Sequence, residues 1–307
     1  MQWCRPLKGV IPVVQTPIHA DGSVDTEGLT RLIDYLVAAK VGGFWALGTG
    51  SEDMNLSFDK RLTVARTVTE ANADRVPLIL GAGFFAMEDI LNFMDATKDL
   101  RFDAYHVMPY HPLMGLDGME KFYRDLAARA PKPLWMYTSA NWCRAFPPEF
   151  VAKLKPVPNI AGVKYSTSKT TDQIAVLAMA EPEFQVITAV ATQFIAVLGM
   201  GTQASTTSLA GPLPEPLIEI YNLYQAGKIE EARAAQLRLN AFLKKMPSRP
   251  KGWNFLGAAE EKYILSLRGI CEPHVTSYYT PLNEAEQAQV RAALDEFGFA
   301  PRVREPA

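Results

Sequence analysis

The feature that most restricts the fold of this chain is the regular alternation of short apolar runs with segments of helical periodicity. The runs are continuous rather than alternating in polarity, as expected of parallel strands buried on both faces. They cover residues 9–18, 42–50, 76–84, 104–110, 133–139, 160–166, 184–190 and 203–209. Eight such units in roughly 200 residues predict an α/β fold, a (β/α)8 TIM barrel.

The segments between the runs have the spacing of amphipathic helices. Leu29, Leu32, Ile33 and Leu36 lie on one helical face, and Ser57 can cap the start of a helix that follows the second run. The alternative is a doubly wound open sheet, for which a GxGxxG turn after the first strand is typical. The first run is not followed by such a turn.

The strand pattern stops after the eighth unit. Residues 213–246, 257–269 and 284–297 are expected to be helical, and Asn283 and Glu286 have the spacing of a capping box. We therefore predict a barrel over residues 1–228 that carries the active site, and a C-terminal helical extension over residues 229–307.

Composition excludes several classes of protein. Of the 307 residues, 48% are hydrophobic and 21% charged, and the net charge of −2 makes a nucleic-acid partner improbable. No apolar stretch approaches the ~18 residues of a membrane span, and the first ten residues lack the apolar core of a secretion signal. The cysteines are far apart and the histidines form no HxH or HExxH motif, so we expect a cytoplasmic protein without a metal site.

A lysine ends the sixth predicted strand. In a TIM barrel the chemistry lies at the carboxyl ends of the strands, where Lys164 on the sixth strand would neighbour Tyr137 on the fifth. Thr49 and Ser51 lie at the end of the second strand. An apolar environment lowers the pKa of a lysine, and a neutral amine can attack a carbonyl carbon. A phenol beside it can transfer the protons.

These residues identify a family. The chain resembles the dihydrodipicolinate synthase / N-acetylneuraminate lyase family of class I aldolases and lyases over nearly its whole length. The matching segments are "PVVQTPIHADGSVD", "GTGSEDMNLS", "VPLILGAG", "MPYHP" and the tyrosine followed by "GVKYS".

The resemblance implies a role for each matching residue. Lys164 would form an imine with a 2-oxo acid such as pyruvate, Tyr137 would transfer protons, and Thr49 would hydrogen-bond Tyr137. The covalent imine makes a separate cofactor unnecessary. The family also implies a homotetramer built as a dimer of dimers.

The turn around Thr49 is the expected site for the substrate carboxylate. Its backbone N–H groups and the hydroxyls of Thr49 and Ser51 would bind the anion. Gly48 and Gly50 are expected to permit this turn through positive φ angles.

The chain also departs from the family pattern. Gly50 replaces a second threonine, His111 replaces a second tyrosine, and Arg144 falls later than the arginine of the synthases. The spacing from Tyr137 to Asn141 is more similar to the branch that dehydrates 4-deoxy-5-oxoglucarate. After the seventh strand, "TAVATQ" lacks the acidic residue common there. The second substrate is therefore open.

Several residues keep two interpretations. Glu52 is either catalytic or a hydrogen-bonding residue behind the turn, and Tyr110 lines either the site or a subunit interface. His111 is either a proton shuttle or an interface residue. On the loop after the fifth strand, Asn141 and Arg144 either bind substrate or are solvated. On the eighth strand, Ser205 and Thr207 either line the pocket or fill the interior of the barrel.

The sequence thus predicts a Schiff-base lyase that cleaves a 2-oxo acid, or condenses it with an aldehyde. Dehydration of a 3-deoxy-2-oxo sugar acid is the alternative reaction, because an imine at C2 acidifies C3 in both cases. A barrel that only senses a small acid, and a metal-dependent aldolase, are the alternatives from other classes.

Overall fold

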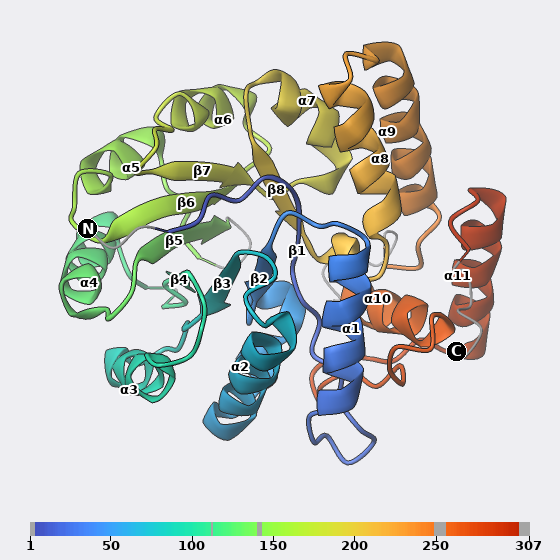
Figure 1. The fold of residues 1–307 in the computed structure, drawn as a ribbon, viewed down its shortest axis with the longest axis horizontal. Helices are drawn as coiled ribbons and strands as arrows, with labels where there is room; N and C mark the ends of the chain where they lie inside the picture. The colour runs from blue at the N-terminus through green and yellow to red at the C-terminus, as the bar shows by residue number, and fades with distance from the viewer. Residues whose placement is uncertain (1–3, 112, 140–142, 249–255, 301–307) are drawn as a thin grey trace.

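The computed structural model describes residues 4–111, 113–139, 143–248 and 256–300. Eight parallel strands form its centre, in the order β1-β8-β7-β6-β5-β4-β3-β2 (Figure 1). The strands are β1 (Gly9–Pro12), β2 (Phe44–Ala46), β3 (Leu78–Gly81), β4 (Ala104–Val107), β5 (Leu134–Ser139), β6 (Ile160–Ser166), β7 (Gln185–Thr188) and β8 (Ala204–Thr207). Between β1 and β2 the ring is completed by the backbone of Val14, whose N–H donates to the Trp45 carbonyl at 3.0 Å. The predicted TIM barrel is confirmed.

Helices lie around the outside of the strands (Figure 1). They are α1 (Thr26–Ala38), α2 (Phe58–Asn72), α3 (Met87–Thr97), α4 (Leu116–Arg129), α5 (Pro148–Leu154), α6 (Thr170–Leu177), α7 (Phe194–Gly199) and α8 (Pro214–Gln225). The predicted cap at Ser57 is present, since its hydroxyl accepts from the Lys60 N–H. The apolar face of α1 is buried, as its 3.6-residue spacing requires.

Most strands are shorter than their apolar runs. The first run was expected to be extended over residues 9–18, yet β1 ends at Pro12. Residues 13–18, which follow β1 in this run, are all buried although they lie outside the strand. Apolar character therefore measures burial there, not strand pairing.

The C-terminal part is helical, as predicted, but the expected helix over residues 213–246 is two helices. The first, α8, ends at Gln225, and α9 (Ile229–Lys244) begins after Gly227, whose φ of 73° is left-handed. A left-handed glycine ends a helix because it lacks the Cβ that opposes this conformation. The others are α10 (Leu256–Leu267) and α11 (Glu284–Glu296), and α11 begins with the predicted capping box of Asn283 and Glu286.

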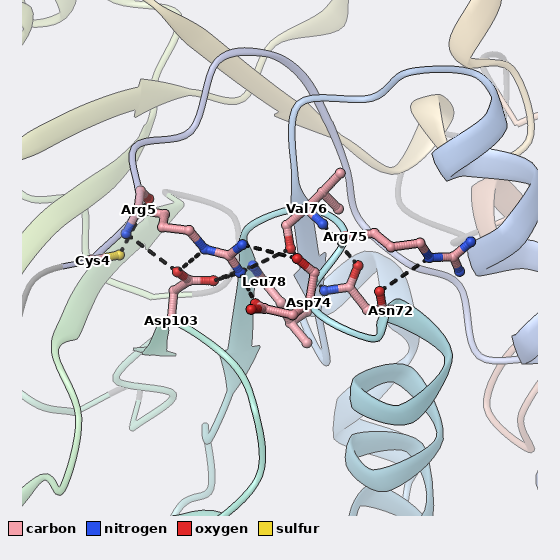
Figure 2. Close-up of polar contacts among 8 residues, drawn as sticks. All are labelled: Cys4, Arg5, Asn72, Asp74, Arg75, Val76, Leu78 and Asp103. Atoms are coloured by element: carbon pink, nitrogen blue, oxygen red, sulfur yellow. Dashed lines mark hydrogen bonds and ion pairs between the residues drawn. The ribbon is translucent and has the colours of Figure 1, made fainter.

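Polar contacts close the amino-terminal end of the barrel. Figure 2 shows the guanidinium of Arg5 between Asp74 and Asp103; its Nε donates to Asp103 Oδ1 at 2.7 Å. Asp103 also accepts from the N–H of Leu78, the first residue of β3. The segment before β1 is thereby held beneath β3 and β4, so that the opposite end of the strands forms the mouth.

No helix among residues 4–111, 113–139, 143–248 and 256–300 is long and apolar enough to cross a bilayer.

Candidate active site

Lys164 and Tyr137 are direct neighbours across β5 and β6. The two residues are paired in the register of these parallel strands. The Lys164 Nζ atom lies 4.0 Å from the centre of the Tyr137 ring and 5.2 Å from that of Trp45 on β2. The predicted juxtaposition of the amine and the phenol is therefore present, and a second aromatic ring that was not predicted completes the enclosure.

Burial sets the ionisation of both groups. Only 4% of Lys164 is exposed, and burial lowers its pKa to about 7, while the negative charge of Asp53 acts in the opposite direction. Burial raises the pKa of Tyr137, so the phenol is protonated at neutral pH. Near pH 7 the site thus holds a partly neutral amine against a neutral phenol.

Thr49 connects Tyr137 to the turn after β2. Its hydroxyl is 3.0 Å from the Tyr137 hydroxyl, as expected for a relay between the two. Thr49 begins a 3₁₀ turn, η1 (Thr49–Ser51), in which Ser51 N–H donates to the Gly48 carbonyl. Among the described residues, no backbone carbonyl accepts from the N–H groups of Thr49 and Gly50.

The prediction that Gly48 and Gly50 adopt positive φ angles is wrong. Gly48 has a φ of −101°, and the left-handed residues of this loop are Leu47 and Glu52. The glycines are required for space instead. A Cβ at position 50 would lie 2.7 Å from the Cβ of Ser208, and one at position 48 would lie 3.0 Å from the Trp45 ring.

Ser51 and Glu52 are buried behind the turn. The Ser51 hydroxyl accepts from the Gly48 N–H at 3.2 Å and so stabilises the turn itself. One oxygen of Glu52 lies 2.6 Å from Lys262 Nζ, and the other accepts from both the N–H and the hydroxyl of Thr276 at 2.7 Å. Both oxygens of Glu52 therefore already have partners from the C-terminal part of the chain.

The remaining predicted residues lie at different depths. On β8, Ser205 is buried and donates to the Thr188 carbonyl at 3.3 Å, whereas Thr207 is half-buried. Tyr110 is buried and donates to Asp53 at 2.7 Å. His111 is exposed, and its Nδ1 accepts from the Leu113 N–H at 3.3 Å.

The loop after β5 is described in part. Arg144 is exposed, and Asn141 lies outside the described residues.

Three residues near Lys164 were missed by the sequence reasoning: Asp53, Trp45 and His106. The imidazole of His106 stacks on Trp45 with 4.2 Å between ring centres, and its Nε2 is 2.9 Å from the Ala46 carbonyl. Burial lowers the pKa of His106 to about 3, so it is neutral and Nε2 is the donor. The available signal for Asp53 was its position directly after Glu52, two residues beyond Ser51, the last residue of the turn.

Comparison with known proteins identifies the family of this chain. Residues 6–297 match the model of the dihydrodipicolinate synthetase family. The 4-hydroxy-tetrahydrodipicolinate synthase of Neisseria meningitidis is 28% identical over 294 residues, which is 95% of this chain and 99% of that protein. The corresponding enzyme of Saccharophagus degradans is 29% identical over 94% of this chain and 98% of its own.

Solved structures agree as well. A dihydrodipicolinate synthase of Bacteroides thetaiotaomicron superimposes with a TM-score of 0.86 and 25% identity over 95% of this chain and 99% of its own. The N-acetylneuraminate lyase of Proteus mirabilis has the same fold, with a TM-score of 0.87 and 23% identity over 96% of this chain and 100% of its own. The chain is therefore a member of the dihydrodipicolinate synthetase family, whose enzymes are lysine Schiff-base lyases.

Proposed function

We propose that this protein forms an imine between Lys164 and C2 of a pyruvate-type 2-oxo acid, and then breaks or forms the C3–C4 bond. The observation that carries the proposal is the buried Lys164 amine, with its pKa lowered to about 7, against the Tyr137 ring. A neutral amine is the nucleophile that imine formation requires.

The residues around Lys164 supply the proton transfers. The amine attacks the carbonyl carbon, and the carbinolamine oxygen must gain protons and leave as water. Tyr137 is protonated at neutral pH because burial raises its pKa, so it can donate a proton to this oxygen. Thr49, hydrogen-bonded to Tyr137, can pass a replacement proton.

The substrate carboxylate would bind at the turn after β2. Successive backbone N–H groups form a concave positive site that suits an anion. Such a site would consist of the N–H groups of Thr49 and Gly50 together with the Thr49 hydroxyl. A carboxylate bound there would fix C2 in reach of Lys164.

No separate cofactor is needed in this scheme. The protonated imine withdraws electrons and stabilises a carbanion at C3. Cleavage of C3–C4 then releases an aldehyde, and condensation with an aldehyde is the reverse.

Dehydration is the second candidate reaction. The same C3 carbanion can expel a hydroxyl group from C4, and the Tyr137-x-x-x-Asn141 spacing favours this reaction because it is similar to that of sugar-acid dehydratases of the family. The second substrate stays open. Gly50 replaces the second threonine of the family, and the relatives are named for different reactions, 4-hydroxy-tetrahydrodipicolinate synthase and N-acetylneuraminate lyase. Product analysis with a panel of 3-deoxy-2-oxo sugar acids separates cleavage, which yields pyruvate, from dehydration, which does not.

The test of the function is chemical trapping. Incubation with pyruvate and borohydride should add one reduced pyruvate to the wild-type protein and none to Lys164→Ala. A protein that binds pyruvate but gives no adduct and no turnover would be the acid-sensing barrel instead.

The C-terminal extension, residues 229–307, is proposed to support the site rather than to act alone. Lys262 and Glu261 of α10 contact Glu52 and Gln15, which belong to the barrel.

We also propose a homo-oligomer, because Phe85, 62% exposed, stacks on Tyr110 at the barrel mouth beside Met54, which is 40% exposed. Light scattering should give a mass above that of one chain.

A further inference from the structure

Asp53 is a buried carboxylate next to the anion-binding turn. It begins the 3₁₀ turn η2 (Asp53–Asn55) and is 0% exposed. Its Oδ2 accepts a hydrogen bond of 2.7 Å from Tyr110, whereas its Oδ1 has no hydrogen-bond partner in the part of the chain that the structure describes. In contrast to Glu52, Asp53 therefore has one buried oxygen without a hydrogen-bond partner among the described residues.

Tyr110 fixes Asp53 on the side of the barrel interior. Its ring belongs to the same buried cluster as Trp45 and Tyr137, the two rings that enclose Lys164 Nζ. A Cβ at Gly83 would lie 2.7 Å from Tyr110 Cε2, so the glycine provides the space for the ring. The hydroxyl that holds Asp53 is thus set by packing within the barrel.

Several charged or titratable groups interact electrostatically with Asp53. Burial raises its pKa, while Arg61, the Tyr110 hydroxyl and nearby backbone N–H groups favour its charged form. Its charge in turn raises the pKa of Lys164 against the effect of burial. The groups come from five elements or loops: Arg61 of α2, Tyr110 after β4, Tyr137 of β5, Lys164 of β6 and Tyr279 before α11.

We propose that Asp53, held by the Tyr110 hydroxyl, is the counter-ion of the positively charged imine on Lys164. This inference rests on the proposed function, because the imine is its premise. Asp53 acts on Lys164 through charge and is a positioning residue.

The charge balance of imine formation requires such a group. A neutral amine and a ketone give a neutral carbinolamine. Its C–O bond then breaks with uptake of one proton, which gives a positive iminium and water. In a buried site a positive charge is costly unless an opposite charge lies near it. Tyr137 donates this proton and Thr49 passes its replacement, so the net step takes one proton from solvent and leaves one positive charge on the imine. The carboxylate of Asp53 balances that charge within the interior.

The test is the pH dependence of pyruvate trapping by cyanoborohydride, which reduces the protonated imine. The pyruvate concentration that gives half-maximal adduct is measured by intact mass between pH 6 and 9. Asp53→Asn should require roughly tenfold more pyruvate at pH 8, because it removes the negative charge that acts on Lys164, and an opposite charge near a group shifts its pKa by about one unit or more. The difference should narrow as the pH falls, because burial raises the pKa of the wild-type Asp53 carboxyl, which loses its charge on protonation. In the variant, the amine is no longer held protonated by that charge and stays neutral to lower pH.

Asp103→Asn is the matched control. It makes the same change from carboxylate to amide at the opposite, amino-terminal end of the barrel, where Asp103 Oδ1 accepts from Arg5 Nε at 2.7 Å. This variant should follow the wild-type profile. Tyr110→Phe keeps the ring but removes the donor, and should shift the profile in the same direction as Asp53→Asn, by less.

The outcomes separate the two proposals. An Asp53→Asn profile that superimposes on those of the wild-type protein and Asp103→Asn would overturn the counter-ion proposal and leave the imine intact. Absence of an adduct in the wild-type protein would overturn the proposed function itself. If thermal melting finds Asp53→Asn unfolded, an unchanged profile for Tyr110→Phe refutes the inference and a shifted one supports it.

Discussion

The Nζ atom of Lys164 lies over the ring of Tyr137, 4.0 Å from its centre, on the neighbouring strand. The register of β5 and β6 brings the two side chains together, and burial acts on them in opposite directions: it lowers the pKa of the lysine and raises that of the tyrosine. Each group is thereby moved toward its neutral form, which is the form that the proposed chemistry uses.

Replacement of Tyr137 by Phe should slow turnover by roughly 10²–10⁴-fold, the usual contribution of a general acid or base. The ring and its contact with Trp45 would remain, so the melting temperature should change little. Tyr165→Phe is the control, because it removes another buried hydroxyl, which donates to the Phe146 carbonyl at 2.8 Å on the outer side of β6. Steady-state rates that fall equally in both variants would remove Tyr137 from the mechanism.

Replacement of Lys164 by Met should change stability in a pH-dependent way. The native pKa of Lys164 is about 7 and the unfolded value is near ~10.5, so between these values the unfolded chain binds more protons. The lysine therefore destabilises the wild-type protein fully below pH 7, and this effect fades as the pH rises toward ~10.5. Urea unfolding should find Lys164→Met more stable by a few kcal/mol at pH 6, with the difference shrinking by pH 9. A difference that grows with pH would contradict the burial of a neutral amine.

Replacement of Lys262 by Met should destabilise the protein by about 3–5 kcal/mol, because Glu52 would then keep a buried charge without its partner. The two side chains are 0% and 2% exposed and 2.6 Å apart. Lys98→Met, which removes an exposed pair with Asp95, should cost less than about 1 kcal/mol. If both substitutions lowered the free energy of unfolding by the same small amount, the Glu52–Lys262 pair would contribute nothing to the stability of the fold.

Substitution of Ala at Gly50 should weaken pyruvate binding more than it affects folding. The added methyl group would meet the Cβ of Ser208 at 2.7 Å and Val13 Cγ1 at 3.2 Å, so the turn that offers its N–H groups must shift. We expect a rise in the KM for the 2-oxo acid of about tenfold, which corresponds to the loss of about one hydrogen bond. At Gly199 an added Cβ meets nothing within 4 Å, and Gly199→Ala is the control. An unchanged KM for Gly50→Ala would exclude the turn as the carboxylate site.

The sequence was sufficient for the barrel and for the pair at its centre. Continuous apolar runs and helical spacing are properties of each segment, and the barrel then dictates that residues ending adjacent strands, such as Lys164 and Tyr137, meet. The break at Gly227 was missed because the helical pattern continues on both sides of it, and only the left-handed φ shows the turn.

Other features depend on contacts between distant segments. The pairing of Glu52 with Lys262 joins residues 210 positions apart, since 262 − 52 = 210, and nothing in either local sequence identifies the partner. Asp53 is similar, because its burial and its bond to Tyr110 become visible only when the loops after β2 and β4 are packed together. The role of Gly50 was misassigned for the same reason: the atom that excludes a side chain there belongs to Ser208.

The most direct measurement is a crystal structure of the protein soaked with pyruvate. The account predicts continuous density from the Nζ atom of Lys164 to C2 of the ligand, with the ligand carboxylate at the N–H groups of Thr49 and Gly50. Pyruvate bound without this link, or linked to another lysine such as Lys262, would contradict it.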